Sequence, residues 1–376
     1  MIYFDNAATT YPKPESVRKA VMSAVANYGS SGRGGHPVAA RTSAAVYSAR
    51  ERIAGFFGAE PENVVFTYNC THALNLAIQG IMSGGGHMII SSLEHNSAAR
   101  PAVKMAESGK IRLSAAQVYD DDNRTVESFR KHIKKDTKAI VCTIASNVTG
   151  QILPYREIAE LCRKHGIVLI ADGAQACGII DVKLTDGINI LCTAGHKGLY
   201  GITGTGLLIS DGKYDIPPII QGGTGSSSQS LNQPVLLPES LESGTVGTAG
   251  IMSMKAGVEF IERLGIQRIF SHENRLCQVL INSLKRDRRI KIYRSDNVEY
   301  VPIVSFNIGN IPSERAAAEL AENGFCLRAG LHCAALAHAQ LGTDTGTIRF
   351  APSVFSKEDD VVNLAAAVHR QCRNLQ

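Results

Sequence analysis

Short apolar segments alternate with helical patterns along the first two thirds of the chain, and this alternation constrains the fold more than any other feature. Segments of strand type stand at residues 64–68, 88–90, 139–144, 167–170, 188–192 and 206–209. Helical patterns of about ten to fifteen residues separate several of them, and strands so separated pair in parallel through crossovers. The near-continuous apolar strands indicate a sheet with both faces covered. We therefore predict an α/β fold in which residues 15–250 form a large domain around a mostly parallel, helix-covered sheet.

A second region follows a glycine- and serine-rich stretch at residues 221–228, which predicts a flexible loop. Helical patterns stand at 251–264, 271–284 and 313–323, a strand pattern at 301–308, and the opening of a last helix at 356–359. Ser313 stands at an N-cap position and Gly324 directly follows the helix end, as capping favours. This region predicts a smaller α+β domain of residues 251–376, which residues 1–14 complete.

The composition is that of an ordinary soluble globular protein, with 44% hydrophobic and 19% charged residues among 376. The net charge of +5 is small and the basic residues are scattered, so nucleic-acid binding has little support. No apolar run is long enough to span a membrane, and the N-terminus lacks a signal-peptide pattern. The nine cysteines include no Cys-x-x-Cys pair, which argues against a disulfide framework or a metal site. We expect a cytoplasmic protein.

Polar residues follow five strand patterns in succession. In an open parallel sheet, ligands bind beyond the carboxyl ends of the strands. One such group alone would mean little, but five at the same edge predict a ligand site rather than core packing. The groups are Thr71 and His72; Glu94, His95 and Asn96; Ser146, Asn147, Thr149 and Gly150; residues 172–175; and residues 195–198.

Two charged residues at this edge, Lys197 and Asp172, have surroundings that suggest a nucleophile and a partner for a cofactor. A lysine becomes a nucleophile where burial or nearby cations disfavour its charged form, and Lys197 ends an apolar strand beside His196. Asp172 follows an intensely apolar run and needs a partner, for which the protonated ring nitrogen of pyridoxal phosphate (PLP) is suited. A solvated loop lysine and an aspartate that caps the next helix are the alternatives.

Two more residues fit such a cofactor. Thr71 opens the helix after residues 64–68, where its hydroxyl would join free backbone N–H groups in binding a phosphate. His95 could stack on a planar ring or be an ordinary surface histidine, and the residue type alone leaves both interpretations open.

Several motifs together resemble a known family. The segments 172–175 (Asp-Gly-Ala-Gln) and 195–197 (Gly-His-Lys) resemble the class V, fold-type-I PLP enzymes. The segment 328–333 (Arg-Ala-Gly-Leu-His-Cys) narrows the resemblance to the cysteine desulfurase and selenocysteine lyase family. Residues 4–10, 93–96, 146–150 and 242–245 also fit, in the family's order and over essentially the whole chain. The resemblance implies a seven-stranded sheet in the large domain, and a small domain that carries the catalytic cysteine and a carboxylate-binding arginine.

The resemblance also implies a role for each matching residue. Lys197 would hold PLP covalently, Asp172 would pair with its ring nitrogen, and His95 would stack on the ring and relay protons. Asn147 and Gln175 would bind the phenolic oxygen of the ring. The phosphate would be held by Thr71, His72, His196 and, from the partner subunit of a homodimer, Thr248. On the substrate side, Arg349 would bind the carboxylate with Asn6, Ala7 and Arg328 nearby, and Cys333 would take the sulfur.

The chemistry of the last two residues agrees with these roles. Arginine is the natural bidentate partner of a carboxylate, and the apolar neighbours of Arg349 argue against a surface ion pair. Cys333 stands beside His332 and close to Arg328, and we expect such cations to lower the pKa of its thiol. The alternative is a buried structural thiol, the role we assign to the other eight cysteines.

The chain departs from the family pattern in three places. Ala194 stands where a serine or threonine usually bonds the phosphate, with Thr193 beside it, so one phosphate contact is expected to be missing or shifted. The loop after Gln221 lacks the pattern of the best-known members. Cys333 lies in a short segment, which favours the compact branch of the family, in which the sulfur stays sheltered until an acceptor docks.

The sequence thus predicts a PLP-dependent cysteine desulfurase that converts L-cysteine to L-alanine and leaves a persulfide on Cys333. We expect a homodimer that passes the sulfur to an acceptor protein. The alternatives are a selenocysteine lyase acting on L-selenocysteine, a class V aminotransferase or epimerase in which Cys333 is not catalytic, and a non-enzymatic scaffold. The presence of both Lys197 and Asp172 argues against the scaffold.

Overall fold

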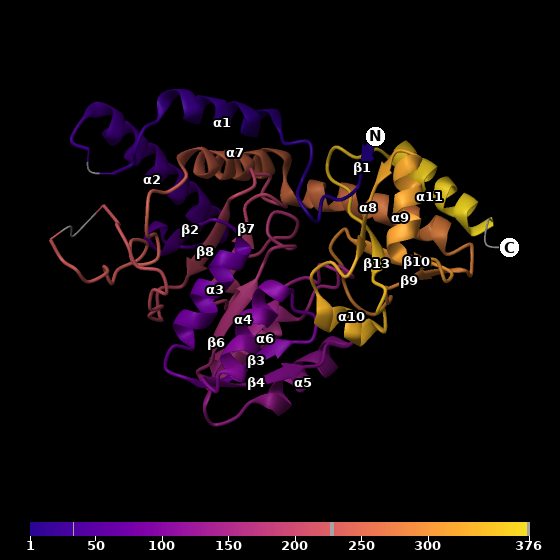
Figure 1. Ribbon diagram of the computed structural model, residues 1–376, viewed down its shortest axis with the longest axis horizontal. Helices are drawn as coiled ribbons and strands as arrows, with labels where there is room; N and C mark the ends of the chain where they lie inside the picture. The colour runs from indigo at the N-terminus through magenta and orange to yellow at the C-terminus, as the bar shows by residue number, and fades with distance from the viewer. Residues whose placement is uncertain (33, 226–228, 374–376) are drawn as a thin grey trace.

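The large domain is built on a seven-stranded sheet (Figure 1). The computed structural model describes residues 1–32, 34–225 and 229–373, so residues 226–228 of the predicted flexible loop lie outside the described part. The strand order is β2-β8-β7-β6-β5-β3-β4; β8 runs antiparallel to β2 and β7, and the other neighbours are parallel. This confirms the predicted mostly parallel sheet. The strands are β2 (Val64–Thr67), β3 (Gly86–Ser91), β4 (Ile111–Ala116), β5 (Thr137–Thr143), β6 (Val168–Asp172), β7 (Ile190–Ala194) and β8 (Gly206–Ser210).

Helices cover both faces of this sheet, which explains why its central strands are apolar throughout. In β6, Val168 and Ile170 belong to one apolar cluster, whereas Leu169 and Ala171 belong to the other. Because successive side chains of a strand point to opposite faces, each cluster fills one face. On one face lie α3 (Cys70–Ile81) and α4 (Asn96–Glu107); on the other lie α2 (Pro37–Phe57), α5 (Asp122–His132), α6 (Tyr155–His165) and α7 (Thr248–Leu264).

The small domain joins the two ends of the chain. Its four-stranded sheet has the order β12-β13-β10-β9, and β1 pairs in parallel with β11 at its side. Phe4 packs in the same apolar cluster as residues of the last helix, so the N-terminal segment belongs to this core. The elements are β1 (Ile2–Tyr3), β9 (Ile290–Ile292), β10 (Val304–Ile308), β11 (Phe325–Cys326), β12 (Arg328–Gly330), β13 (Thr347–Phe350), α8 (Ile266–Leu284), α9 (Ser313–Glu322), α10 (Ala335–Leu341) and α11 (Glu358–Arg373).

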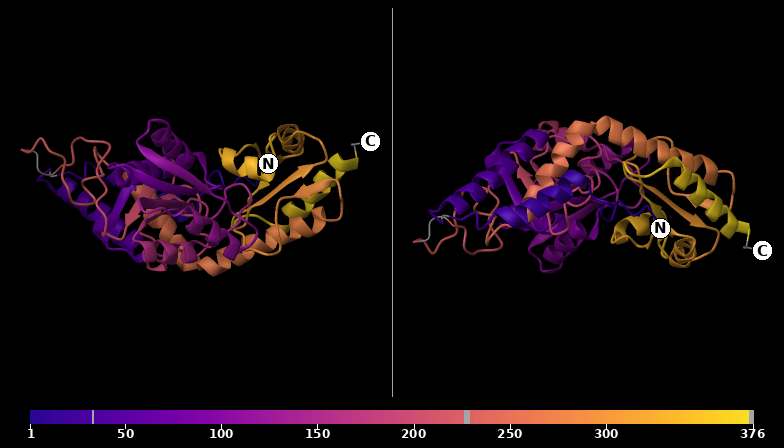
Figure 2. Two further views of the ribbon diagram at one scale, coloured as in Figure 1. Left: turned by 90° about the horizontal axis from the view of Figure 1, so that it is seen from below. Right: turned by 90° about the horizontal axis from the view of Figure 1, so that it is seen from above.

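Two consecutive helices connect the domains. Figure 2 shows α7 and α8 running one after the other along one side of the molecule. α7 packs on α1 (Glu15–Asn27) and α2, whereas α8 packs on α11. This packing favours a domain boundary near Gly265 over the predicted one at residue 250. Short 3-10 turns at Pro61–Asn63 and Leu184–Asp186 complete the elements, and no helix in the described ranges is long and apolar enough to cross a membrane.

Gly257 lets α7 approach the turn that follows β7. A Cβ atom at Gly257 would lie 2.0 Å from the carbonyl oxygen of Leu199, closer than any real contact allows. Leu199 stands two residues after Lys197 in that turn, so α7 supports the predicted lysine from behind. No side chain other than hydrogen fits here without moving backbone.

We predict that Gly257→Ala destabilises the protein by about 3 kcal/mol, because the added methyl group overpacks a backbone contact. Gly55→Ala is the matched control: Gly55 is also helical, but nothing lies within 4 Å of an added Cβ, so alanine should be neutral or slightly stabilising there. Thermal unfolding midpoints of the two variants check this. Equal midpoints for both would contradict the packing.

Candidate active site

A cavity of about 190 Å³ lies beyond the carboxyl ends of the parallel strands. All five polar groups that follow the strands contribute to it, as predicted for this edge of the sheet. Their individual roles stay predictions. The lining residues are Asn69, Cys70, Thr71, His95, Ser97, Thr143, Ala145, Asn147, Asp172, Ala174, Gln175, Ala194, His196 and Lys197.

Lys197 and Asp172 both line this cavity but do not form an ion pair with each other. Burial lowers the pKa of the Lys197 amine, and the negative charge of Asp172 opposes that shift without cancelling it. The lysine is therefore not the solvated loop residue of the alternative reading. The charge of Asp172 acts on Lys197 across a gap that another chemical group can fill.

Asp172 has one occupied oxygen and one free oxygen. Oδ1 accepts from the backbone N–H of Ala174 (2.9 Å) and from the thiol of Cys70 (3.4 Å). Oδ2 has no hydrogen-bond partner among the described residues, and Asp172 is only 3% exposed. A turn rather than a helix follows Asp172, so it does not cap a helix. A carboxylate held by one oxygen in this way presents the other to a cationic partner.

Cys70 is a residue of this site that the sequence did not single out. Burial, and next the charge of Asp172, raise the pKa of its thiol well above the usual value, so it stays protonated and acts as the donor to Asp172. Its position one residue before Thr71 was the available signal.

His95 caps α4 and is held as a neutral ring. Its Nδ1 accepts from the backbone N–H of Ser97 (3.0 Å) and lies 2.7 Å from the Ser97 hydroxyl. Burial lowers the pKa of His95, chiefly by desolvation. With Nδ1 accepting, the ring proton sits on Nε2, which has no partner within the described part of the chain. The ring can therefore offer a proton from Nε2.

The start of α3 forms the other end of the cavity. Asn69 caps the helix by accepting from the backbone N–H of His72 (2.8 Å). The N–H groups of Cys70 and Thr71 have no partner among the described residues, and the buried Nδ1 of His196 has none either. Unpaired helix N–H groups beside a threonine hydroxyl suit an anion such as a phosphate.

Ala194 departs from the family pattern, and the hydroxyl of its neighbour Thr193 does not replace the missing one. Ala194 lines the cavity with a methyl group, whereas the hydroxyl of Thr193 donates to the carbonyl of Gly173 (3.3 Å). Adjacent residues of a strand point to opposite faces, so Thr193 cannot replace the missing hydroxyl. A missing phosphate contact at Ala194 therefore stays a prediction.

Two predicted phosphate ligands lie outside the cavity lining. His72 stacks on Tyr68 with ring centroids 5.1 Å apart, and its Nε2 is buried without a partner. Thr248 is the first residue of α7. Their contacts to a phosphate stay predictions, and that of Thr248 needs a second subunit.

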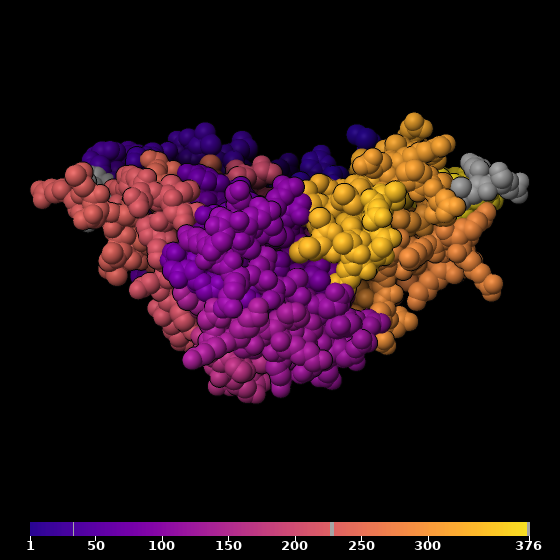
Figure 3. All heavy atoms as spheres, turned by 60° about the horizontal axis from the view of Figure 1, so that its bottom comes forward, coloured from indigo at the N-terminus to yellow at the C-terminus, as the bar shows by residue number. Residues whose placement is uncertain are grey.

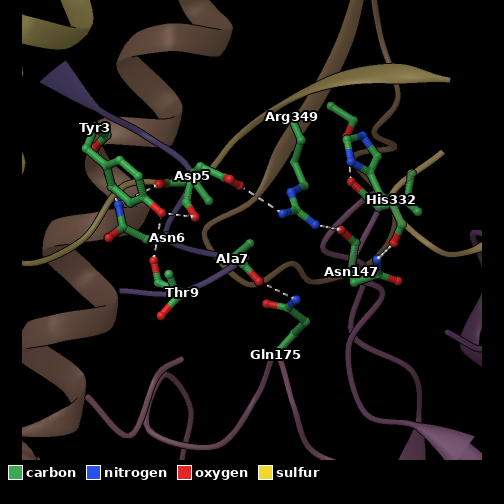
Figure 4. A network of polar contacts seen from close by, with 12 residues as sticks. Tyr3, Asp5, Asn6, Ala7, Thr9, Asn147, Gln175, His332 and Arg349 are labelled. Atoms are coloured by element: carbon green, nitrogen blue, oxygen red, sulfur yellow. Dashed lines mark hydrogen bonds and ion pairs between the residues drawn. The ribbon is translucent and has the colours of Figure 1, made fainter. Parts of the chain in front are cut away.

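A polar network joins the small domain to the cavity (Figure 4). Arg349 of β13 is 3% exposed; Nη1 donates to the Asn147 carbonyl (2.8 Å) and Nη2 to Asp5 Oδ1 (3.1 Å). Burial lowers the pKa of Arg349, and Asp5 opposes the shift. Asn6 donates to the Ala351 carbonyl (3.0 Å), and Gln175 donates to the Ala7 carbonyl (3.0 Å). Asn147 and Asp5 therefore contact the buried guanidinium directly, and the carboxylate-binding roles of Arg349, Asn6, Ala7 and Arg328 stay predictions.

Cys333 stands in a tight turn between β12 and α10. His332 and Cys333 have φ values of 48° and 55°, which strains the backbone of residues with side chains. Two hydrogen bonds hold the turn: Asn147 donates to the His332 carbonyl (2.7 Å), and the N–H of Asn96, next to His95, donates to the Cys333 carbonyl (2.8 Å). The turn is thereby attached to two segments that line the cavity.

Two expectations about this turn need correction. Burial lowers the pKa of His332 to about 2, and its Nε2 lies 3.0 Å from the Thr347 carbonyl, so His332 is neutral and adds no positive charge beside Cys333. Arg328, exposed on β12, is the remaining cation. Cys333 itself is exposed and outside the cavity lining, so a single chain does not shelter its sulfur.

An N-terminal strap, residues 5–13, holds the turn that carries Lys197. The carbonyl oxygen of His196 accepts from Thr9 Oγ1 (3.0 Å), from the N–H of Thr10 (3.2 Å) and from Lys13 Nζ (2.8 Å). Burial lowers the pKa of Lys13 to about 8. These contacts join residues far apart in sequence, so only the folded chain reveals them.

Comparison with known proteins identifies the family to which the chain is similar. Residues 2–364 match the model of the family described as Aminotransferase class-V. The chain is 29% identical, over 96% of its length and 92% of the relative's, to a probable cysteine desulfurase of Methanothermobacter thermautotrophicus. It resembles the apo structure of cysteine desulfurase from Thermococcus onnurineus NA1, with a TM-score of 0.92, 28% identity, and coverage of 100% and 95% of the two chains. It also resembles the S-sulfonic acid form of cysteine desulfurase CsdA from Escherichia coli, with a TM-score of 0.88, 25% identity and the same coverage.

Glu94 lies behind the cavity as a buried carboxyl. Oε1 accepts from the Ser91 hydroxyl and from the N–H of Thr143 (2.7 Å), whereas Oε2 is buried without a partner. Burial raises the pKa of Glu94 from 4.5 to about 8. The folded protein therefore keeps this proton at neutral pH.

We predict that Glu94→Gln removes a pH-dependent loss of stability. Between pH 4.5 and about 8, the unfolded chain releases the Glu94 proton and the folded chain keeps it, so the wild type loses stability as pH rises through this window. Glutamine does not titrate. The difference in free energy of unfolding between variant and wild type should grow by about 4 kcal/mol from pH 5 to pH 8.5. Urea unfolding of the cofactor-free proteins measures it, and parallel pH profiles would show that Glu94 is ionised when folded.

Proposed function

The chain belongs to the aminotransferase class-V family, and within it to the cysteine desulfurases, and we propose that it removes sulfur from L-cysteine with PLP as its cofactor. The observation that carries the proposal is the cavity at the sheet edge. Lys197 and Asp172 line it together, and Asn147 connects it to Arg349 and to the turn that carries Cys333.

The residues present fit PLP. Lys197 would hold the cofactor, and Asp172 would bind the ring nitrogen through its free Oδ2. Thr71, the unpaired N–H groups at the start of α3 and the orphaned Nδ1 of His196 would bind the phosphate. Asn147 and Gln175 each keep a second amide N–H for the phenolic oxygen, since each amide has two hydrogens and donates one of them within the described part of the chain.

When bound, PLP supplies an electron sink for charge that develops at the α-carbon of the substrate. Lys197 supplies a base, because burial lowers the pKa of its amine. His95 holds a proton on Nε2 that it can give to a developing negative charge. The strap on the His196 carbonyl keeps the lysine in position.

Arg349 binds the carboxylate of L-cysteine in this proposal. It is buried, it is held by the Asn147 carbonyl, and its Nε has no partner. A buried guanidinium with a free nitrogen is suited to bidentate recognition of a carboxylate.

Cys333 receives the sulfur. Its thiolate attacks the sulfur of L-cysteine, so that an S–S bond forms while the C–S bond of the substrate breaks. The electron pair of the broken bond stays with the substrate carbon, which takes up a proton and becomes L-alanine. The Cys333 persulfide keeps the transferred sulfur, so no external oxidant or reductant is needed. The exposure of Cys333 lets an acceptor protein collect this sulfur.

The alternatives are not favoured. The curated relatives are cysteine desulfurases, which speaks against an aminotransferase or epimerase in which Cys333 is incidental. Selenocysteine lyase activity would use the same residues, and no feature of the site favours it. All nine cysteines are free thiols, which fits the reducing cytoplasm that we propose as the location.

We also propose that the protein acts as a homodimer. Residues 219–225 and 229–239 project from the end of the molecule remote from the small domain (Figures 1 and 3). This segment exposes Ile219, Ile220, Leu231, Val235 and Leu236, the last at 77%. Clustered exposed apolar side chains mark an interaction surface. The segment leads directly into Thr248, so pairing there would bring Thr248 toward the partner's cavity.

Cys333→Ala should lower L-cysteine desulfurase turnover by about two orders of magnitude or more and abolish the protein persulfide, because no thiol remains to attack the sulfur. The visible absorbance of bound PLP should persist. Mass spectrometry of the alkylated protein and assay of L-alanine measure the two effects. Cys326→Ala is the control, since Cys326 is partly exposed on β11, and it should keep turnover. Full turnover in Cys333→Ala would exclude Cys333 as the acceptor.

Leu236→Glu should shift the protein from dimer to monomer, because it places a charge in the proposed interface. PLP affinity should fall with it if Thr248 of one subunit serves the cavity of the other. Sedimentation velocity and PLP titration measure both. Val362→Glu, at a residue 52% exposed on α11, is the matched control and should leave the dimer intact. A wild-type monomer that binds PLP tightly would exclude the shared site.

A further inference from the structure

Asp5 occupies part of the guanidinium edge of Arg349 that an amino-acid carboxylate would need. Nη2 donates to Asp5 Oδ1 (3.1 Å), whereas Nε is buried and has no partner in the part of the chain that the structure describes. Nε and Nη2 form one edge of the planar guanidinium, and such an edge binds a carboxylate through two parallel hydrogen bonds. Asp5 therefore fills one of the two positions and leaves the other empty.

The Asp5 side chain is attached much more weakly than its backbone. The carbonyl of Asp5 accepts from the N–H of Ala8 (3.0 Å) and from the Tyr3 hydroxyl (3.1 Å), and Asp5 forms a bridge with Ala351. Among the described residues its carboxylate makes a single hydrogen bond, to Arg349, and its side chain is 21% exposed. The carboxylate can therefore turn away while the strap stays in place.

The contact between Asp5 and Arg349 neutralises a buried positive charge. Arg349 is 3% exposed, and a buried cation without a counter-ion destabilises a protein. Asp5 supplies the negative charge when no ligand is present. A ligand carboxylate that binds Nε and Nη2 brings a second negative charge to the same cation, so the two carboxylates compete.

We propose that Asp5 stands in for the substrate carboxylate on Arg349 and is displaced when an amino acid binds. This inference rests on the proposed function, because it takes Arg349 as the carboxylate site. Asp5 is then a positioning residue: it holds Arg349 ready and it weakens the binding of every carboxylate ligand. L-Alanine, which carries the same carboxylate as L-cysteine, leaves more easily for that reason.

Titration of the PLP-loaded protein with L-alanine tests the inference by calorimetry. Asp5→Asn keeps the size of the side chain and removes its charge, so the Kd for L-alanine should fall about tenfold. Without ligand, the same variant should unfold at a lower temperature than the wild type. Added L-alanine should raise its unfolding temperature by more than it raises that of the wild type. A purely structural role predicts the opposite for binding, namely weaker L-alanine binding in the damaged protein.

Asp5→Glu provides the second variant. Its longer side chain carries the charge further over the guanidinium, so the Kd for L-alanine should rise about threefold. L-Alaninamide, which lacks the carboxylate, should respond to neither substitution. An unchanged or higher Kd in Asp5→Asn, or an unchanged Kd in Asp5→Glu, overturns the inference. If Arg349→Gln binds L-alanine as well as the wild type does, the carboxylate site itself is wrong, and that result counts against the proposed function separately.

Discussion

The burial of an amine across from a half-free carboxylate organises this protein. Burial at the sheet edge lowers the pKa of the Lys197 amine, and the charge of Asp172, which forms no ion pair with it, only partly opposes that shift. Each group alone would be costly to bury. Together with the start of α3 and its unpaired N–H groups they line one cavity, which we propose as the site of PLP.

The two domains meet through side-chain amides and carbonyls rather than through apolar packing alone. Asn147 accepts from Arg349 with its carbonyl and donates to the His332 carbonyl with its amide, so the carboxylate site and the Cys333 turn share one residue of the large domain. The strap adds a second link, from Asp5 at Arg349 to the donors on the His196 carbonyl. A chain of hydrogen bonds therefore connects Arg349 to the backbone beside Cys333 and to the backbone beside Lys197.

The sequence predicted the central strands and the sheet edge well because both follow from local pattern. It missed β4, an edge strand in which only the first and last residues are buried. It also missed the polar helix α5 and the helix α4 with its internal Pro101. It took His332 for a cation because burial, which neutralises it, is a property of the fold. The strap, the Cys70 thiol and the Asp5 contact were hidden for the same reason: each joins residues about a hundred or more positions apart.

The most direct test of the central claim is to reduce the PLP-loaded protein with borohydride and map the modified peptide by mass spectrometry. Reduction makes the bond between PLP and its lysine permanent. The account predicts a pyridoxyl group on Lys197, on no other lysine in significant yield, and its loss in Lys197→Ala. A label on another lysine, or no label on a protein that is otherwise folded, would contradict the assignment of the buried amine and with it the site.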